Sequence, residues 1–263
     1  MNRINLPLRI FSVLAVIFLI LPTLIIIPMS FSSGRTLKFP PPGYSLRWYE
    51  NLFTSPIWTD SAVSSLQVAI FTVIVATVLG TIAALGLTRS QFTGKNLIQT
   101  IILSPLIIPL VIVAVGMFSV FVRWRIAGSI LALVAAHTVL AIPFVVINVM
   151  ASLRTLDRNL ELASANLGAG PLRTFWYITL PLISPGALAG ALFAFITSWD
   201  EIVIAIFLTS PTLRTLPVVM WTQVRTEVDP TIAAAATLLT LVTVILFTIS
   251  SLLRLRGSQA GGN

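Results

Sequence analysis

Long apolar runs occupy most of this sequence and restrict it to folds that lie within a membrane. Of its 263 residues, 57% are hydrophobic and only 9% are charged, whereas a soluble domain carries about 25% charged residues. A spanning helix needs about 20 mostly apolar residues, and irregular backbone is not tolerated against lipid. We therefore predict an all-α polytopic membrane protein with about six transmembrane helices, at Leu8–Met29, Ala62–Leu87, Leu97–Val122, Ser129–Met150, Ile183–Leu208 and Thr231–Leu253.

Proline residues within these runs predict kinks, because proline removes a helical hydrogen bond; they are Pro22, Pro105, Pro109 and Pro143. The first run is too long for the apolar part of a signal peptide and no A-x-A-like site follows it, so we expect a retained anchor. An even number of spans places both termini on one side. A cytoplasmic position for them leaves nine of the sixteen Lys and Arg residues inside and seven outside, which favours that orientation.

The segment between the first two runs, Ser30–Ser61, is the longest predicted outer connection. Three consecutive prolines from Pro40 favour extended backbone. After them, Ser45–Phe53 has apolar residues at helical spacing and includes Trp48 and Tyr49, which are residue types typical of the membrane interface. We predict an interfacial anchoring helix here, and direct contact with a partner is the alternative.

Several classes of function are excluded by what the sequence lacks. It has no Cys and a single His, so neither thiolates nor a histidine cluster can bind a metal. The pI near 11.3 is explained by lipid headgroups and the positive-inside rule and does not indicate nucleic-acid binding. No G-x-x-x-x-G-K, G-x-S-x-G or H-E-x-x-H motif occurs, so the chain is predicted not to be an enzyme. His137 is expected to be packed or hydrogen-bonded, with a role in a solute pathway as the alternative.

One polar stretch between two apolar runs, Leu160–Pro181, has helical patterning of its own. Just before and within it, apolar residues recur at spacings of four, three and four, which is one face of a helix. Asp157 can cap the start of this helix, Gly168 and Gly170 can end it, and Pro171 suits the first position of a second helix. A helix of about ten residues is marginal alone in water, so its apolar face must pack on something. That face consists of Leu156, Leu160, Ala163 and Leu167.

At these residues the chain resembles the membrane subunits of type I ATP-binding-cassette (ABC) importers. Their cytoplasmic signature is E-A-A-x-x-x-G-x9-I-x-L-P. Gly168 is followed by nine residues and then by Ile178, Thr179, Leu180 and Pro181, so the second half of the signature matches. The alternative interpretation is that this stretch only connects two spans.

The first half of the signature departs from the family pattern. The E-A-A positions hold Leu162, Ala163 and Ser164, and Glu161 lies one residue early. A shift of one residue rotates a side chain by about 100° around a helix. A contact that needs the family's acid at its usual place is therefore in question, although the small Ala163 and Ser164 still permit close approach.

The resemblance implies a type I ABC importer permease fold, multi-pass in a bacterial inner membrane. The short helix would be a coupling helix that receives force from an ATP-binding subunit. The implied partners are a homologous permease, as a heterodimer, two ATP-binding subunits, a periplasmic or extracellular solute-binding protein and membrane lipid. ATP and Mg would be bound by the ATP-binding subunits, which leaves this chain no cofactor. The residues implied in coupling are Leu160, Glu161, Leu162, Ala163, Ser164, Leu167 and Gly168.

The resemblance also implies a division of the chain. Residues 1–60 would hold the first span and a periplasmic segment, residues 61–253 the transmembrane domain shared with the family, and residues 254–263 a cytoplasmic tail.

Two acidic residues lie within the fifth predicted span, in the sequence Trp199-Asp200-Glu201. A charge at the membrane centre costs about 2.5–3.5 kcal/mol on insertion scales, and no Lys or Arg occurs in this span. The acids therefore need a partner. Either they line the pathway of a cationic solute, with Trp199 as a cation–π face, or one of them bonds a helix terminus or a partner subunit. Adjacent residues diverge by about 100° on a helix, so we do not expect both acids to face one cavity.

Small residues precede this pair at four-residue steps, at Gly186, Gly190, Ala194 and Ser198. Such a ridge permits close helix packing, within the subunit or at an interface.

The run S-W-D-E-I-V-I-A-I-F-L-T-S-P from Ser198, and D-P-T-I-A-A-A-A-T from Asp229, resemble the second permease of spermidine/putrescine-type importers. This resemblance implies transport of a polyamine or a related small cation. Alternatives are another solute of the same subfamily, such as an opine, an amino acid derivative or an aminophosphonate, and a stand-alone secondary transporter or channel.

Overall fold

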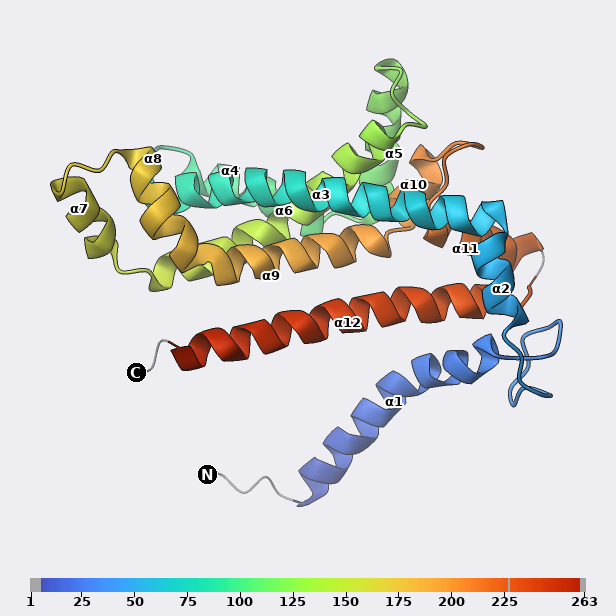
Figure 1. Ribbon diagram of the computed structural model, residues 1–263. Helices are drawn as coiled ribbons and strands as arrows, with labels where there is room; N and C mark the ends of the chain where they lie inside the picture. Colours follow the sequence, from blue (N-terminus) through green and yellow to red (C-terminus); the bar gives the residue numbers. More distant parts are fainter. Residues whose placement is uncertain (1–5, 227, 261–263) are drawn as a thin grey trace. The chain divides into compact units, whose positions relative to one another are not determined.

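The computed structural model describes residues 6–226 and 228–260, with side chains in the last helix as far as Leu252, and its regular elements are all helices (Figure 1). They are α1 (Leu6–Ser30), α2 (Arg47–Thr54), α3 (Pro56–Arg89), α4 (Lys95–Leu103), the 3₁₀ helix η1 (Ser104–Leu106), α5 (Leu110–Arg123), α6 (Ile130–Thr155), α7 (Arg158–Asn166), α8 (Pro171–Thr174), the π-helix η2 (Phe175–Thr179), α9 (Leu180–Trp199), α10 (Val203–Leu208), α11 (Leu216–Thr226) and α12 (Thr231–Ala260).

The predicted all-α membrane fold is confirmed, but two of the predicted spans are not continuous helices. Five helices in the described residues are long and apolar enough to cross a membrane, and α4–η1 with α5 makes a sixth if this bent pair is one span. The pair bends by 103° at Pro105 and Pro109, so the expected kink is a sharp break. The fifth predicted span, Ile183–Leu208, was wrong as one helix, because α9 ends at Trp199 and α10 begins at Val203.

The chain divides into two compact units, one from Met1–Asp60 and Val219–Val242 and the other from Ser61–Val218 and Thr243–Asn263. In the first unit, the predicted helix after the prolines is present as α2. Trp48 Nε1 donates to the Ser32 carbonyl at 2.7 Å, and the Tyr49 hydroxyl hydrogen-bonds Ser30 Oγ at 2.8 Å. Asn51 Nδ2 donates to Thr231 Oγ1 at 2.9 Å. Hydrogen bonds therefore tie α2 to the end of α1 and to the start of α12.

The predicted tail, residues 254–263, continues α12 as helix to Ala260, and its last three residues lie outside the described part of the chain.

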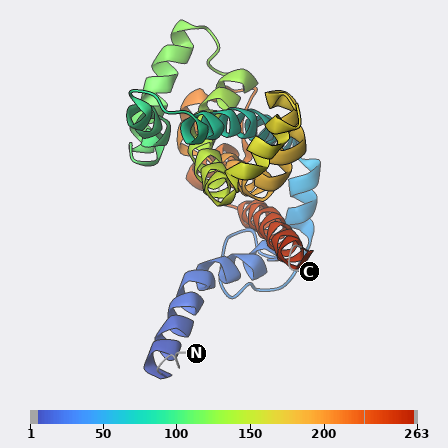
Figure 2. The ribbon, with the colours of Figure 1, turned by 90° about the vertical axis from the view of Figure 1, so that its left-hand side faces the viewer.

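Helix α6 is the centre of the second unit, and α3 and α9 pack against it (Figures 1 and 2). Val145 of α6 is fully buried between two glycines. A Cβ atom on Gly80 of α3 would lie 2.7 Å from Val145 Cβ, and one on Gly190 of α9 would lie 2.7 Å from Val145 Cα. Further along the ridge, a Cβ on Gly186 would lie 2.6 Å from the Asn148 carbonyl. The predicted small-residue seam is confirmed, and it lies within the subunit.

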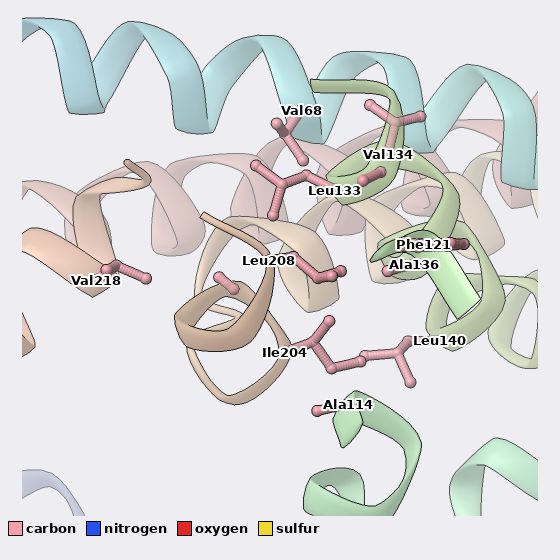
Figure 3. Packing of buried hydrophobic residues seen from close by; sticks show 12 residues of the cluster. Val68, Ala114, Phe121, Leu133, Val134, Ala136, Leu140, Ile204, Leu208 and Val218 are labelled. Atoms are coloured by element: carbon pink, nitrogen blue, oxygen red, sulfur yellow. The ribbon is translucent and has the colours of Figure 1, made fainter. Parts of the chain in front are cut away.

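A second buried cluster joins α5 and α10 to α6 (Figure 3). Leu133 and Leu140 of α6 point toward Ile204 and Leu208 of α10. The cluster is completed by side chains of α3, α5 and α11, among them Val68, Ala114, Phe121 and Val218. The short helix α10 is thereby held against α5 and α6 after the break that follows α9.

We expect Gly190→Ala to destabilise the protein by about 1–3 kcal/mol, as overpacking does, because the new methyl would meet the Val145 backbone. Thermal unfolding of the detergent-solubilised protein measures this. Gly116→Ala is the matched control, since nothing lies within 4 Å of a Cβ at that helical glycine, and it should be neutral or stabilising by up to about 1 kcal/mol. Equal unfolding temperatures for the two variants would contradict the close packing of α9 on α6.

Candidate functional site

The two helix breaks of the second unit meet at one cavity of about 550 Å³. Non-helical backbone at membrane depth is tolerated only where protein buries it or where it lines a polar space. Here one wall comes from the break between α4 and α5, another from the break between α9 and α10, and a third from α6. The lining residues include Pro105, Leu106, Leu140, Phe144, Phe193, Thr197, Asp200 and Glu201.

Glu201 closes the break on the side of α10. The first N–H groups of any helix lack intrahelical partners. Glu201 Oε1 accepts from the Ile204 N–H at 2.8 Å, and Oε2 accepts from the Ala205 N–H at 2.9 Å. The residue is only 7% exposed. One of the two alternatives raised by the sequence, an acid that bonds a helix terminus, describes these contacts of Glu201.

His137 lies beside this carboxylate. Its Nδ1 hydrogen-bonds Ser198 Oγ at 2.8 Å, and its Nε2 lies 3.5 Å from Glu201 Oε2. The imidazole is 1% exposed, so the expectation of a packed, hydrogen-bonded histidine is confirmed. No three acidic or histidine side chains gather as metal ligands would in the described part of the chain.

Asp200 differs from Glu201 in its exposure and its contacts. It follows the last turn of α9, is exposed, and lines the cavity together with Glu201. Because the helix stops here, the 100° separation expected on a continuous helix does not apply, and both acids border one space. Among the side chains that the structure describes, residues 6–226 and 228–252, Asp200 forms no ion pair. Its carboxylate is therefore available to a cation that enters the cavity.

Trp199 is turned away from this space. It is 5% exposed and stacks on Phe195, with ring centroids 5.5 Å apart. It is not among the residues that line the cavity. The aromatic rings that do line it are those of Phe144 and Phe193, which stack with centroids 5.9 Å apart.

The polar stretch after α6 folds as the predicted helical hairpin. Asp157 caps α7 by accepting from the Asn159 N–H at 2.9 Å. Gly168 has φ +85°, a left-handed conformation that suits a glycine helix stop. Pro171 is at the first turn of α8, which continues through η2 into α9. The expected roles of Asp157, Gly168 and Pro171 are confirmed. The expectation that Gly170 helps to end the first helix was wrong, because Gly170 is the N-cap residue of α8.

Helix α7 presents two unlike faces. Glu161 and Ser164 are half-buried and face α8 and η2: Thr179 Oγ1 donates to Glu161 Oε1 at 2.8 Å, and Ser164 Oγ hydrogen-bonds Thr174 Oγ1 at 3.0 Å. Leucines and small residues elsewhere on α7 are exposed. The exposed residues implied in coupling are Leu160, Leu162, Ala163, Leu167 and Gly168, with Leu167 at 89%.

Sequence reasoning missed Arg89, which lies at the end of α3 and contacts the hairpin. Its guanidinium pairs with Glu161 at 3.0 Å. The two residues are far apart in the sequence and belong to no common motif. In the sequence, the pairing was indicated only by their opposite charges on the same predicted side of the membrane.

Residues 76–256 match the family model "Binding-protein-dependent transport system inner membrane component". The putrescine transport system permease protein PotI of Escherichia coli K12 is 36% identical, covering 84% of this chain and 81% of the relative. The spermidine/putrescine transport system permease protein PotC of Haemophilus influenzae is 28% identical, covering 90% and 91%.

Two similar solved structures show the fold. One is a bacterial alginate ABC transporter in complex with an alginate pentasaccharide-bound periplasmic protein, with a TM-score of 0.70, 18% identity and coverage of 92% of each chain. The other is the MetNI methionine ABC transporter in an inward-facing conformation, with a TM-score of 0.59, 19% identity and coverage of 76% of this chain and 97% of that one.

Removal of the Glu201 carboxylate should destabilise the break before α10. We expect Glu201→Ala to cost about 1–2 kcal/mol, as the loss of a helix cap does, because two N–H groups lose their acceptor in an apolar setting. Glu201→Gln keeps one acceptor oxygen and should cost less. Thermal unfolding in detergent measures both, and an unchanged transition for Glu201→Ala would rule out this capping role.

The hairpin contact between α7 and α8 can be tested by cross-linking, since the chain has no native Cys. The Ser164 and Thr174 hydroxyls lie 3.0 Å apart, so the double variant Ser164→Cys/Thr174→Cys should form a disulfide under mild oxidant. Protection from a maleimide-polymer label is the measurement. Leu167→Cys with Thr174→Cys is the control, because Leu167 is exposed; persistent labelling of the first pair would contradict the hairpin geometry.

Proposed function

The chain belongs to the family of binding-protein-dependent transport system inner membrane components, and we propose that its particular solute is a polyamine, putrescine or spermidine, carried through the cavity at Asp200. As a member of this family it is a non-catalytic, multi-pass inner-membrane permease of an ATP-driven ABC importer.

The observation that carries the proposal is the exposed Asp200 carboxylate on the wall of an otherwise mostly apolar cavity. A charge at membrane depth is costly and marks a functional site by default. Glu201 is occupied by the N–H groups of α10, whereas Asp200 has no ion-pair partner among the described residues. A polyamine offers a matching ammonium group. Its methylene chain suits the rings of Phe144 and Phe193, whose faces also attract cations.

The names of two relatives agree with this solute class, since PotI is a putrescine permease and PotC a spermidine/putrescine permease. The behaviour expected of each acid then differs. Asp200 contacts the solute directly, while Glu201 and the buried Trp199 fix the wall behind it.

We further propose that α7 is the coupling helix, on the cytoplasmic side together with both termini. Its exposed Leu160, Leu162 and Leu167 would be covered by an ATP-binding subunit, which also binds the ATP and Mg. Residues 61–253 would form the transmembrane domain, paired with a homologous permease. Two ATP-binding subunits would lie below this pair, and a solute-binding protein would dock on the outer side.

Asp200→Asn should reduce polyamine uptake by about ten-fold or more, which corresponds to about 1.4 kcal/mol of lost attraction. The measurement is uptake of radiolabelled putrescine and spermidine by proteoliposomes that contain the assembled transporter, with ATP inside. Asp60→Asn is the matched control, since Asp60 is also an exposed aspartate, in the second turn of α3, but is not one of the residues that line the cavity.

Two results would count against the proposal. Unchanged uptake by Asp200→Asn would remove the cation pathway through this cavity. Uptake by this chain alone, driven by an ion gradient without ATP-binding subunits, would replace the importer mechanism with secondary transport.

A further inference from the structure

We propose that Glu161 is a positioning residue that joins α7 to two membrane helices at once, and that it does not face the ATP-binding subunit. This inference rests on the proposed coupling role of α7. Glu161 would act inside the permease: when α7 moves, its contacts would move the end of α3 and the start of α9 together.

One carboxylate oxygen makes both contacts. Glu161 Oε1 lies 3.0 Å from Arg89 Nη2, in the last turn of α3, and accepts the Thr179 hydroxyl at 2.8 Å, just before α9. The side chains of Arg89 and Glu161 are 24% and 19% exposed. Pairs that are partly withdrawn from water are screened less than surface pairs. Loss of one partner leaves the other charge unpaired in a partly buried place, which is strongly unfavourable.

Within the described residues, this is the one ion pair between an arginine or lysine and an acid. The chain is poor in charges, and most of the arginines whose side chains the structure describes are exposed. An ion pair that joins two helices and shares its acid with a hydroxyl of a third element is unlike the solvated pairs that cover soluble proteins, which contribute little to stability.

The space around Glu161 makes its polar contacts more important for transmitting a movement of α7. A cavity of about 400 Å³ lies in the elbow between α7, α8 and η2, bordered by Leu85, Glu161, Ala165, Phe175 and Thr179. Side chains that border such a gap make fewer packing contacts across it. Polar side-chain contacts join α7 to its neighbours here: Glu161 to Thr179 of η2 and Arg89 of α3, and Ser164 to Thr174 of α8.

The π-helical turn η2 is a place where the backbone conformation before α9 can change. Thr179 is the last residue of η2, and π-helical turns are rare and occur frequently at functional sites. The hydroxyl that binds Glu161 therefore lies where the irregular turn becomes regular helix. A pull on Glu161 acts on this turn and on α3 simultaneously.

The test uses the transporter assembled from this chain, its partner permease, the ATP-binding subunits and the solute-binding protein, in proteoliposomes. Glu161→Gln keeps an acceptor for Thr179 but removes the charge, and Glu161→Arg/Arg89→Glu restores an opposite pair. We expect Glu161→Gln to retain bound ATP-binding subunits while the amount of putrescine imported per ATP hydrolysed falls by about five-fold or more, a modest coupling energy between sites. The charge-reversed pair should recover most of that ratio.

Leu160→Ala, on the exposed side of α7, separates this inference from the proposed function. It should lower the amount of ATP-binding subunit that co-purifies. Suppose that Leu160→Ala lowers this amount. The positioning role of Glu161 is then wrong, and the coupling role of α7 stands, if Glu161→Gln leaves the import ratio unchanged or weakens binding of the ATP-binding subunit as strongly as Leu160→Ala does. If neither variant changes binding or the import ratio, both fail.

Discussion

The contact of the Glu201 carboxylate with the N–H groups of α10 makes the rest of the cavity possible. A helix that stops inside an apolar span leaves its successor with unpaired donors, and each unsatisfied group in lipid costs several kcal/mol. Glu201 satisfies two of these donors from within the same chain. The break between α9 and α10 can therefore be a permanent part of the fold. Once the break exists, Asp200 lies at its corner without an obligatory partner.

Helix α6 provides the rigid surface on which this arrangement is built. It is the most buried of the membrane-length helices among the described residues. Val145 is held between Gly80 and Gly190, and the same helix carries His137 to within 3.5 Å of Glu201. Interiors this closely packed do not deform continuously. Movement in the second unit is therefore expected at the irregular segments, namely the two breaks and the turn at η2.

Local features of the fold could be predicted from the sequence because their causes are local. Asp157, Gly168 and Pro171 act through the backbone of their own turns, so the hairpin limits followed directly from residue type. The ridge through Gly186 and Gly190 was also predictable, since small residues at every fourth position of a helix allow another helix to pack closely against it.

Features that depend on distant partners could not be predicted. A hydropathy window averages over the breaks after Leu106 and Trp199, because the residues on both sides of each break are mostly apolar. Asp200 and Glu201 were expected to diverge because a continuous helix separates adjacent side chains by about 100°. The pairing of Arg89 with Glu161, and of His137 with Ser198, joins residues that share no short-range pattern. Family resemblance located the hairpin, but only the fold showed that Glu161 is turned inward.

The two ends of α9 connect the proposed sites of force and of solute. Thr179, which binds Glu161, immediately precedes this helix, and Asp200 immediately follows it. A helix of 20 residues spans about 30 Å at 1.5 Å per residue. Its glycine ridge packs closely against α6, and Ser198 at the far end of the ridge hydrogen-bonds His137 of α6. Coupling between sites requires an element with two discrete arrangements. If the π-helical turn just before α9 converted to regular helix, α9 would shift along α6, and this would be a rearrangement of that kind. Such a shift would move Asp200 relative to Glu201, which α10 holds in place, and would thereby alter the cavity wall that the solute meets.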